Sequence, residues 1–372
     1  MSTNTVMVCA TEVGSAVNLT EIVLQTSAEL EYLVYSKNAA AGVFTESGIN
    51  IVECSFIDKL DLAKSELTRI RPDAVLCGRA IDRNSADRYF VAAARLLAIP
   101  SISVIDEWYD YRENYTDLYD ELEYFPDAVC CPDNQAKSEA IGEGLTESQL
   151  YVTGSPAYSR FFDKLSTFND QQPTRLSVLS WPVSHPIITF ISEHVEDVHS
   201  QIYFNKIGSV RTPGYDEEKV KMDLVSALTM CGKSCTVLEK IHPSSEVTNQ
   251  TNVSHGPSIN WHVIREGRAT SYMWHSDLVI GMRSAALIEA ALMGKPTVSY
   301  QPNLSGPDRC TAARKKMIAS FIKYNELVDW LIHNWDMRRE IHIERPEFAQ
   351  KDAPAKVLSV VQQKISEFSR RN

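Results

Sequence analysis

Short runs of consecutive apolar residues alternate with stretches of helical periodicity through the first half of the chain. A run such as Thr5–Ala10 has the length of a strand and no polar alternation, which is typical of strands buried on both faces of a parallel sheet. We expect strands at Thr5–Ala10, Leu30–Tyr35, Ile49–Cys54, Asp73–Gly78, Ile102–Ile105, Ala128–Cys131 and Leu150–Thr153. We expect helices from about Val17, around Ala39–Thr45, and at Leu60–Arg71 and Ser85–Ala98. This order predicts a doubly wound α/β domain.

The pattern breaks at Ser166–Pro186, where three prolines and many small polar residues indicate a linker, and then it restarts. The expected strands are Ile187–Ile191, Cys235–Lys240, Ile259–Ile264, His275–Ile280 and Thr297–Tyr300, and the expected helices are Glu217–Cys231, Ser284–Met293, Lys316–Trp335 and Ala353–Asn372. We therefore predict an N-terminal Rossmann-like domain (1–165), a linker (166–186), a second Rossmann-like domain (187–335) and a C-terminal helical segment (336–372) that packs back on the domains. Ligands of open parallel sheets bind beyond the carboxyl ends of the strands, so the expected site is a central cleft that the two domains face.

Composition agrees with a globular protein of two domains. The chain has 372 residues, 44% of them hydrophobic, and single cores stop growing beyond about 250–300 residues. No apolar run is long enough for a membrane span, and the first residues do not resemble a secretory signal. The eight cysteines lie mostly in apolar stretches, which is typical of buried, reduced thiols. We expect a cytoplasmic location, with peripheral attachment at the inner face of a membrane left open, and the net charge of −11 disfavours nucleic acid as a partner.

The clearest candidate for chemistry is the segment 276–296, which is predicted to form strand, turn, helix, turn and strand. The turn Gly281–Ser284 should leave backbone N–H groups free at the start of a helix, where they can bind an anion, and Arg283 adds a cation. Glu289 lies further along this helix, where a carboxylate can accept hydrogen bonds from a ribose diol. An ordinary strand–helix–strand unit with a surface glutamate explains the same spacing equally well.

The string LIEAALMGKPTVSY resembles the segment of GT-B glycosyltransferases that holds the nucleotide ribose. The resemblance implies that Glu289 binds the ribose. Retaining members often carry a second acidic residue eight positions earlier, and this chain has Gly281 there, so the resemblance implies an inverting enzyme.

The string Lys240-Ile-His242-Pro-Ser244-Ser245 follows a predicted strand and resembles a motif of bacterial sialyltransferases and CDP-glycerol glycerophosphotransferases. Related His-Pro-Arg triplets occur in non-hydrolysing UDP-N-acetylglucosamine 2-epimerases. The resemblance implies that His242, with Lys240 and Ser244, meets the donor phosphate. It also implies that the loop holding Ser192 and His194 faces the donor phosphates. A strand-end histidine bonded to the backbone is the plainer alternative.

The N-terminal domain offers two carboxylates as the general base for an acceptor hydroxyl: Glu12 after the first strand, and Asp106, which is followed by Trp108, Tyr109 and Tyr111. Both could equally be ordinary loop carboxylates. Asp82 and Arg83 match the Gly-Asp-Arg triplet of the epimerases only loosely, and the other epimerase signatures are absent. We find no Asp-X-Asp triplet, so we expect metal-independent chemistry without a cofactor.

These observations favour a nucleotide-sugar-dependent glycosyltransferase that transfers a sugar to a glycan or other hydroxyl acceptor, for instance in the biosynthesis of a bacterial surface polysaccharide. Three alternatives stay open: a sugar-nucleotide 2-epimerase or hydrolase, a catalytically inactive binding subunit, and a DNA-modifying glycosyltransferase. Homo-oligomerisation also stays open.

Overall fold

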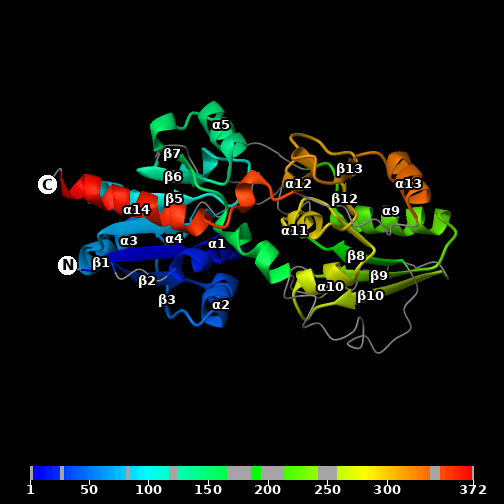
Figure 1. Ribbon diagram of the computed structural model, residues 1–372, viewed down its shortest axis with the longest axis horizontal. Helices are drawn as coiled ribbons and strands as arrows, with labels where there is room; N and C mark the ends of the chain where they lie inside the picture. Colours follow the sequence, from blue (N-terminus) through cyan, green and yellow to red (C-terminus); the bar gives the residue numbers. More distant parts are fainter. Residues whose placement is uncertain are drawn as a thin grey trace. The chain divides into compact units, whose positions relative to one another are not determined.

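The computed structural model describes residues 3–25, 29–80, 84–116, 124–165, 186–193, 213–241, 258–335 and 344–370. The chain divides into two compact units (Figure 1). Unit 1 comprises Met1–Ser166 and Arg345–Asn372, and unit 2 comprises Thr167–Glu344. The linker expected at 166–186 lies, except for its last residue, outside the described residues.

The described part of unit 1 holds a parallel sheet of seven strands in the order β3-β2-β1-β4-β5-β6-β7. The strands are β1 (Asn4–Ala10), β2 (Leu30–Ser36), β3 (Ile51–Glu53), β4 (Ala74–Cys77), β5 (Ser101–Val104), β6 (Ala128–Cys131) and β7 (Leu150–Val152). The helices are α1 (Val13–Val23), α2 (Asn38–Glu46), α3 (Leu60–Ile70), α4 (Ala86–Leu96), α5 (Asn134–Gly142), α6 (Pro156–Ser159) and α14 (Ala353–Ser369), with short 3-10 turns at Glu113–Tyr115, Glu147–Gln149 and Glu347–Ala349.

Both faces of this sheet are buried. Alternate residues of β1 point to opposite faces, so Val6 and Val8 pack in one apolar cluster while Met7 and Cys9 pack in another. Helices α1 and α14 cover the first face, and α3 and α4 cover the second. In Figure 1 the C-terminal helix α14 lies alongside the strands of unit 1, although all of unit 2 separates it from them in sequence.

Unit 2 repeats the arrangement, with a parallel sheet in the order β10-β9-β8-β11-β12-β13 within its described part. The strands are β8 (Ile187–Ile191), β9 (Cys235–Lys240), β10 (Ile259–Ile264), β11 (Leu278–Gly281), β12 (Thr297–Tyr300) and β13 (Ala319–Phe321). The helices are α9 (Glu217–Met230), α10 (Ala269–His275), α11 (Ala286–Leu292), α12 (Thr311–Arg314) and α13 (Tyr324–His333). Helices α9 and α13 pack on one face of this sheet, where Val220, Leu224, Leu327 and Leu331 meet the strands.

The predicted fold class, two doubly wound Rossmann-like domains, is confirmed by these two sheets. Several local predictions are wrong. Helix α1 begins at Val13, four residues before the predicted start, because the strand is followed by only a two-residue turn. The predicted helix Lys316–Trp335 divides into the edge strand β13 and helix α13, since Ala319–Phe321 pairs with β12. Helices α5 and α10 were not predicted.

No helix in the described ranges is long and apolar enough to cross a membrane. All eight cysteines are free thiols, and seven of them are buried, as their apolar surroundings in the sequence predict.

Candidate functional site

In each unit the strand order reverses beside the first strand, between β1 and β4 in unit 1 and between β8 and β11 in unit 2. Loops that leave neighbouring parallel strands in opposite directions open a crevice at such a switch point, where ligands commonly bind. Several candidate residues that the structure describes closely follow the strands at these switch points, among them Glu12 after β1 and Arg283 after β11.

A serine joins the two sides of the crevice in unit 1. The Ser15 hydroxyl donates to the carbonyl oxygen of Arg79 at 2.5 Å and accepts the Arg79 backbone N–H at 2.9 Å. Residue 78 must be glycine for this contact, because a Cβ there would lie 2.3 Å from the Ser15 Cβ. The loop after β1 and the loop after β4 are therefore fixed to each other by a neutral group.

Asp106, one of the two predicted bases, lies beside this crevice after β5. Its Oδ2 lies 3.3 Å from the Ser15 hydroxyl, and a Cβ on Gly14 would lie only 2.6 Å from the same oxygen. Its Oδ1 is inaccessible to solvent and has no hydrogen-bond partner among the described residues. Burial, together with the neighbouring Glu107 carboxylate, raises the pKa of Asp106 to about 7. A carboxyl group with such a pKa can take up and release a proton near neutral pH.

Arg79 supports the loop that carries Asp106. This buried guanidinium donates from Nε to the Asn114 Oδ1 at 2.8 Å, forms an ion pair with Glu107, and lies 4.9 Å from the centre of the Tyr109 ring. Sequence reasoning missed Arg79 and Asn114. The available signal was an arginine directly after the glycine that ends a buried strand, a position where a solvated side chain is not expected.

A second buried carboxyl group, that of Asp87, contacts the loop after β1. Asp87, in the first turn of α4, accepts a hydrogen bond from the Thr11 hydroxyl, and its Oδ1 has no hydrogen-bond partner among the described residues. Burial raises the pKa of Asp87 to about 6. Glu12, the other predicted base, is the half-buried N-cap residue of α1, and its side chain does not cap the helix.

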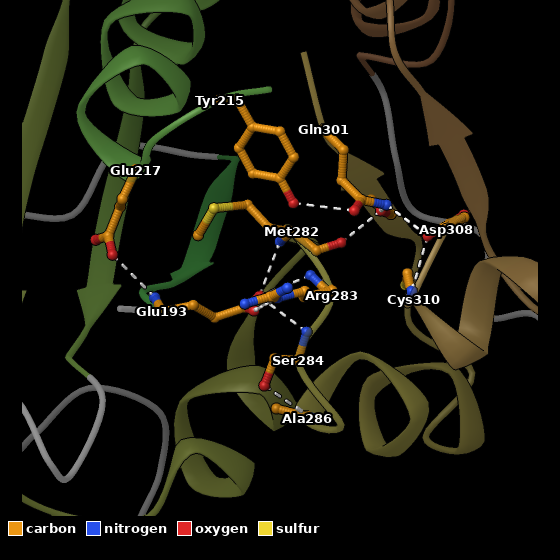
Figure 2. Close-up of polar contacts among 11 residues, drawn as sticks. Glu193, Tyr215, Glu217, Met282, Arg283, Ser284, Ala286, Gln301, Asp308 and Cys310 are labelled. Carbon is orange, nitrogen blue, oxygen red and sulfur yellow. Dashed lines mark hydrogen bonds and ion pairs between the residues drawn. The ribbon is translucent and has the colours of Figure 1, made fainter. Parts of the chain in front are cut away.

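The equivalent crevice in unit 2 is closed by a carboxylate. Glu193, directly after β8, accepts the backbone N–H groups of Met282, Arg283 and Ser284 on its Oε1, at 3.1, 2.8 and 2.8 Å (Figure 2). The prediction that the N–H groups of the turn Gly281–Ser284 are free is therefore wrong for these three residues. The physical reason is that a buried turn cannot leave donors unsatisfied, and the chain supplies an anion of its own. From the sequence we selected Ser192 and His194 as candidates but not Glu193, which lies between them.

The predicted phosphate ligands of unit 2 that lie within the described residues are also engaged. The Lys240 ammonium donates to the carbonyl oxygen of Arg265 at 2.8 Å, and burial lowers its pKa. The Ser192 hydroxyl donates to Glu217 Oε1 at 2.7 Å, and Arg283 Nε lies 3.9 Å from Glu193 Oε2. The Ser284 hydroxyl accepts the Ala286 N–H at 3.2 Å, at the start of α11.

Glu289 projects from α11 and is half-buried. Its Oε2 accepts a hydrogen bond from the Thr270 hydroxyl at 3.1 Å, which links it to helix α10. Its role towards a ribose stays a prediction.

Three predicted site residues, His194, His242 and Ser244, lie outside the described residues, as do Asp82 and Arg83. In the ranges that are described, no group of three or more His, Cys, Asp or Glu side chains is arranged to hold a metal ion.

A pocket of about 620 Å³ opens at the start of α9, lined in part by Tyr215 and Met222. Its charged lining residues are Asp216, Glu218 and Lys219, and Lys219 forms an ion pair with Asp223. The pocket is therefore acidic and does not favour an anionic ligand.

The sequence matches no protein-family model and no curated protein, whereas the structure resembles many solved structures. The UDP-N-acetylglucosamine 2-epimerase of Neisseria meningitidis, bound to UDP-N-acetylglucosamine, superposes with a TM-score of 0.68 at 13% identity, covering 96% of this chain and 100% of that one. The same enzyme of Rickettsia bellii gives 0.67 at 13% identity, with 99% of both chains covered. The glycosyltransferase of kitacinnamycin gives 0.50 at 12% identity, covering 99% of this chain and 96% of that one.

The chain has the GT-B fold. The resemblance noted in the sequence is thus confirmed at the level of the fold. At such low identity the superposition establishes the GT-B architecture, and activity has to be argued from the side chains around the two crevices.

Proposed function

We propose that this GT-B protein is an inverting, metal-independent glycosyltransferase that transfers a sugar from a nucleotide donor to a hydroxyl acceptor. In this proposal unit 1 supplies the general base and unit 2 binds the donor. A glycan, such as a bacterial surface polysaccharide, is the acceptor class that we favour.

The observation that carries the proposal is the state of Asp106. Asp106 contacts Ser15 through Oδ2, its inaccessible Oδ1 has no partner among the described residues, and its pKa is raised to about 7, so it can take up and release a proton near neutral pH as a general base must. An inverting transfer by direct displacement needs one such base. The Arg79–Glu107 pair fixes the loop around Asp106, so the carboxyl group is held in place before a substrate binds.

Donor binding is assigned to Lys240, Arg283 and Glu289. The two cations lie at the carboxyl ends of β9 and β11, where they can balance the charge of a phosphate group, and Glu289 can accept hydrogen bonds from a ribose. His242, Ser244 and His194 complete the set that the sequence motifs suggest.

The first experiment is a calorimetric titration with UDP, CMP, CDP and GDP. We expect one of them to bind, and Glu289→Gln to weaken that binding by about tenfold through the loss of a charged hydrogen-bond acceptor. Asp329→Asn, which removes a charge from an exposed residue of α13 in the same unit, should leave binding unchanged. If none of the four nucleotides binds, the proposal is wrong.

A sugar-nucleotide 2-epimerase is the second candidate function. It is favoured by the superposition of the Neisseria and Rickettsia epimerases over almost the whole chain. It is disfavoured by the string Gly78-Arg-Ala-Ile-Asp82-Arg83, which matches the Gly-Asp-Arg triplet of that family only loosely. Incubation of the protein with the donor sugar nucleotide alone separates the two functions, because only an epimerase yields the isomerised sugar without an acceptor.

A further inference from the structure

The strongest feature outside the proposed chemistry is the carboxylate of Glu193. This side chain is 10% exposed and reaches from the end of β8 across to the turn after β11 (Figure 2). A single oxygen, Oε1, accepts three consecutive backbone N–H groups, those of Met282, Arg283 and Ser284. Consecutive N–H groups that converge on one point form the type of concave donor site in which proteins bind phosphate and other anions.

The position of Glu193 is fixed from its backbone side as well. Glu217 accepts the Glu193 backbone N–H on Oε2 at 3.1 Å and the Ser192 hydroxyl on Oε1 at 2.7 Å. Glu217 is in turn paired with the buried Lys221, whose ammonium lies 2.8 Å from Glu217 Oε1 and also contacts Glu239. The carboxylate is thus directed into the turn by a connected polar network and does not lie there as an isolated rotamer.

We propose that Glu193 determines the donor specificity of unit 2 by occupying, as an internal anion, the place at the Met282–Ser284 turn that a phosphate group would otherwise take. The proposal deepens the proposed function, because it concerns how the same unit binds its donor. With the turn filled, the donor phosphate is held by side chains such as Lys240 and Arg283 rather than by backbone N–H groups.

Electrostatics gives the physical reason for exclusion. A phosphate oxygen in contact with these N–H groups would have to lie against the Glu193 carboxylate, and two like charges at contact in a buried site repel strongly. The turn also has no donors in excess, since its three converging N–H groups are all used by Oε1. Burial raises the pKa of Glu193 even though three N–H groups and Arg283 favour the charged form. Keeping a carboxylate here therefore costs folding free energy, which is expected of a group retained for specificity.

The test uses the full chain, inorganic pyrophosphate as the probe, and Glu193→Ala. In the wild-type protein pyrophosphate should leave hydrogen exchange of the backbone N–H groups of residues 282–284 unchanged. In Glu193→Ala these groups should exchange faster, pyrophosphate should restore their protection, and the affinity for pyrophosphate should rise by about tenfold or more. Asp329→Ala, which removes one negative charge from an exposed residue of α13 in the same unit, is the matched control and should behave as the wild type.

Equal affinity of wild type and Glu193→Ala, or a gain in affinity without renewed protection of residues 282–284, would overturn the proposal. Protection of these residues by pyrophosphate in the wild type would overturn it as well. If Glu193→Ala fails to fold, Glu193→Gln keeps one acceptor oxygen without the charge, and it should show a smaller gain in the same direction. A gain with pyrophosphate but no binding of any nucleotide would show that Glu193 keeps anions out of the turn and would remove the proposed function, whereas nucleotide binding without the gain would keep the proposed function and overturn this inference.

Discussion

The two units of the chain join the loops at their switch points with different chemistry. In unit 1 the Ser15 hydroxyl bonds to the backbone of Arg79, so a neutral group joins the loops and the nearby Asp106 keeps one oxygen without a partner. In unit 2 the Glu193 carboxylate joins the loops, and its Oε1 accepts three N–H groups. The same topology thus leaves one carboxyl group with an oxygen that has no partner among the described residues and commits another carboxyl group to the backbone. The fold alone does not decide how a switch point is built, because a single side chain in each unit sets the contacts there.

The largest effect should come from removing the ionisable carboxyl group of Asp106 in unit 1. Asp106→Asn keeps the size of the side chain but cannot accept a proton, so we expect transfer to fall by about 100-fold to 10,000-fold. Steady-state kinetics with the donor found by calorimetry measures the loss. Asp61→Asn, an exposed residue of α3 in the same unit, is the matched control and should keep wild-type rates. An Asp106→Asn enzyme with full activity would show that unit 1 has another base, and Glu12 would be examined next.

The same variant should be more stable than the wild type at alkaline pH. The pKa of Asp106 is raised in the folded state to about 7, above its value of about 4 in an unfolded chain. The folded state therefore binds the proton more tightly, and the wild type loses stability as the pH rises from about 4 to about 7. Asp106→Asn lacks this loss, so its melting temperature relative to the wild type should increase across that window and stay higher at pH 8. Asp87, whose pKa is also raised, lowers the stability of both proteins as the pH rises. The quantity to measure is therefore the difference in melting temperature between Asp106→Asn and the wild type.

The smallest effect should come from removing the neutral Ser15 hydroxyl, which joins the two loops of unit 1. Ser15→Ala leaves the buried N–H and carbonyl groups of Arg79 without the partner that the hydroxyl provides, and we expect a loss of about 1–2 kcal/mol in the free energy of unfolding. Urea denaturation followed by circular dichroism measures it. Ser47→Ala removes an exposed hydroxyl at the end of α2 and should change stability by less than about 0.5 kcal/mol. Equal stability of both variants would mean that the Ser15 bridge does not hold the two loops together.

The sequence predicted the sheets well because buried parallel strands have an unmistakable pattern. The expected ranges for β6, β8, β9, β10 and β12 coincide with the observed strands. The edge strand β13 was missed, since Ala319–Phe321 is short and half-exposed and lies next to residues with helical periodicity. Its pairing with β12 is a tertiary effect that local propensity cannot report.

The candidate site was less predictable than the fold. The turn after β11 was found from its spacing, but the residue that fills it comes from a loop about 90 positions away in the sequence. The same is true of Arg79, whose partners Glu107 and Asn114 lie 28 and 35 positions further along. Motifs show which residue types a site contains, whereas the pairing between loops emerges only when the sheet brings strand ends together.

Helix α14 has a consequence for how the protein is made. Its residues Val357, Val361 and Ile365 belong to the same apolar cluster as Val6 and Val8 of β1, although all of unit 2 separates them in sequence. A ribosome synthesises the chain from its N-terminal side, so one apolar face of the unit 1 sheet stays partly exposed until helix α14 has left the ribosome. During translation this apolar face is open to chaperones or to other nascent chains, and the first unit becomes a finished domain only after the second.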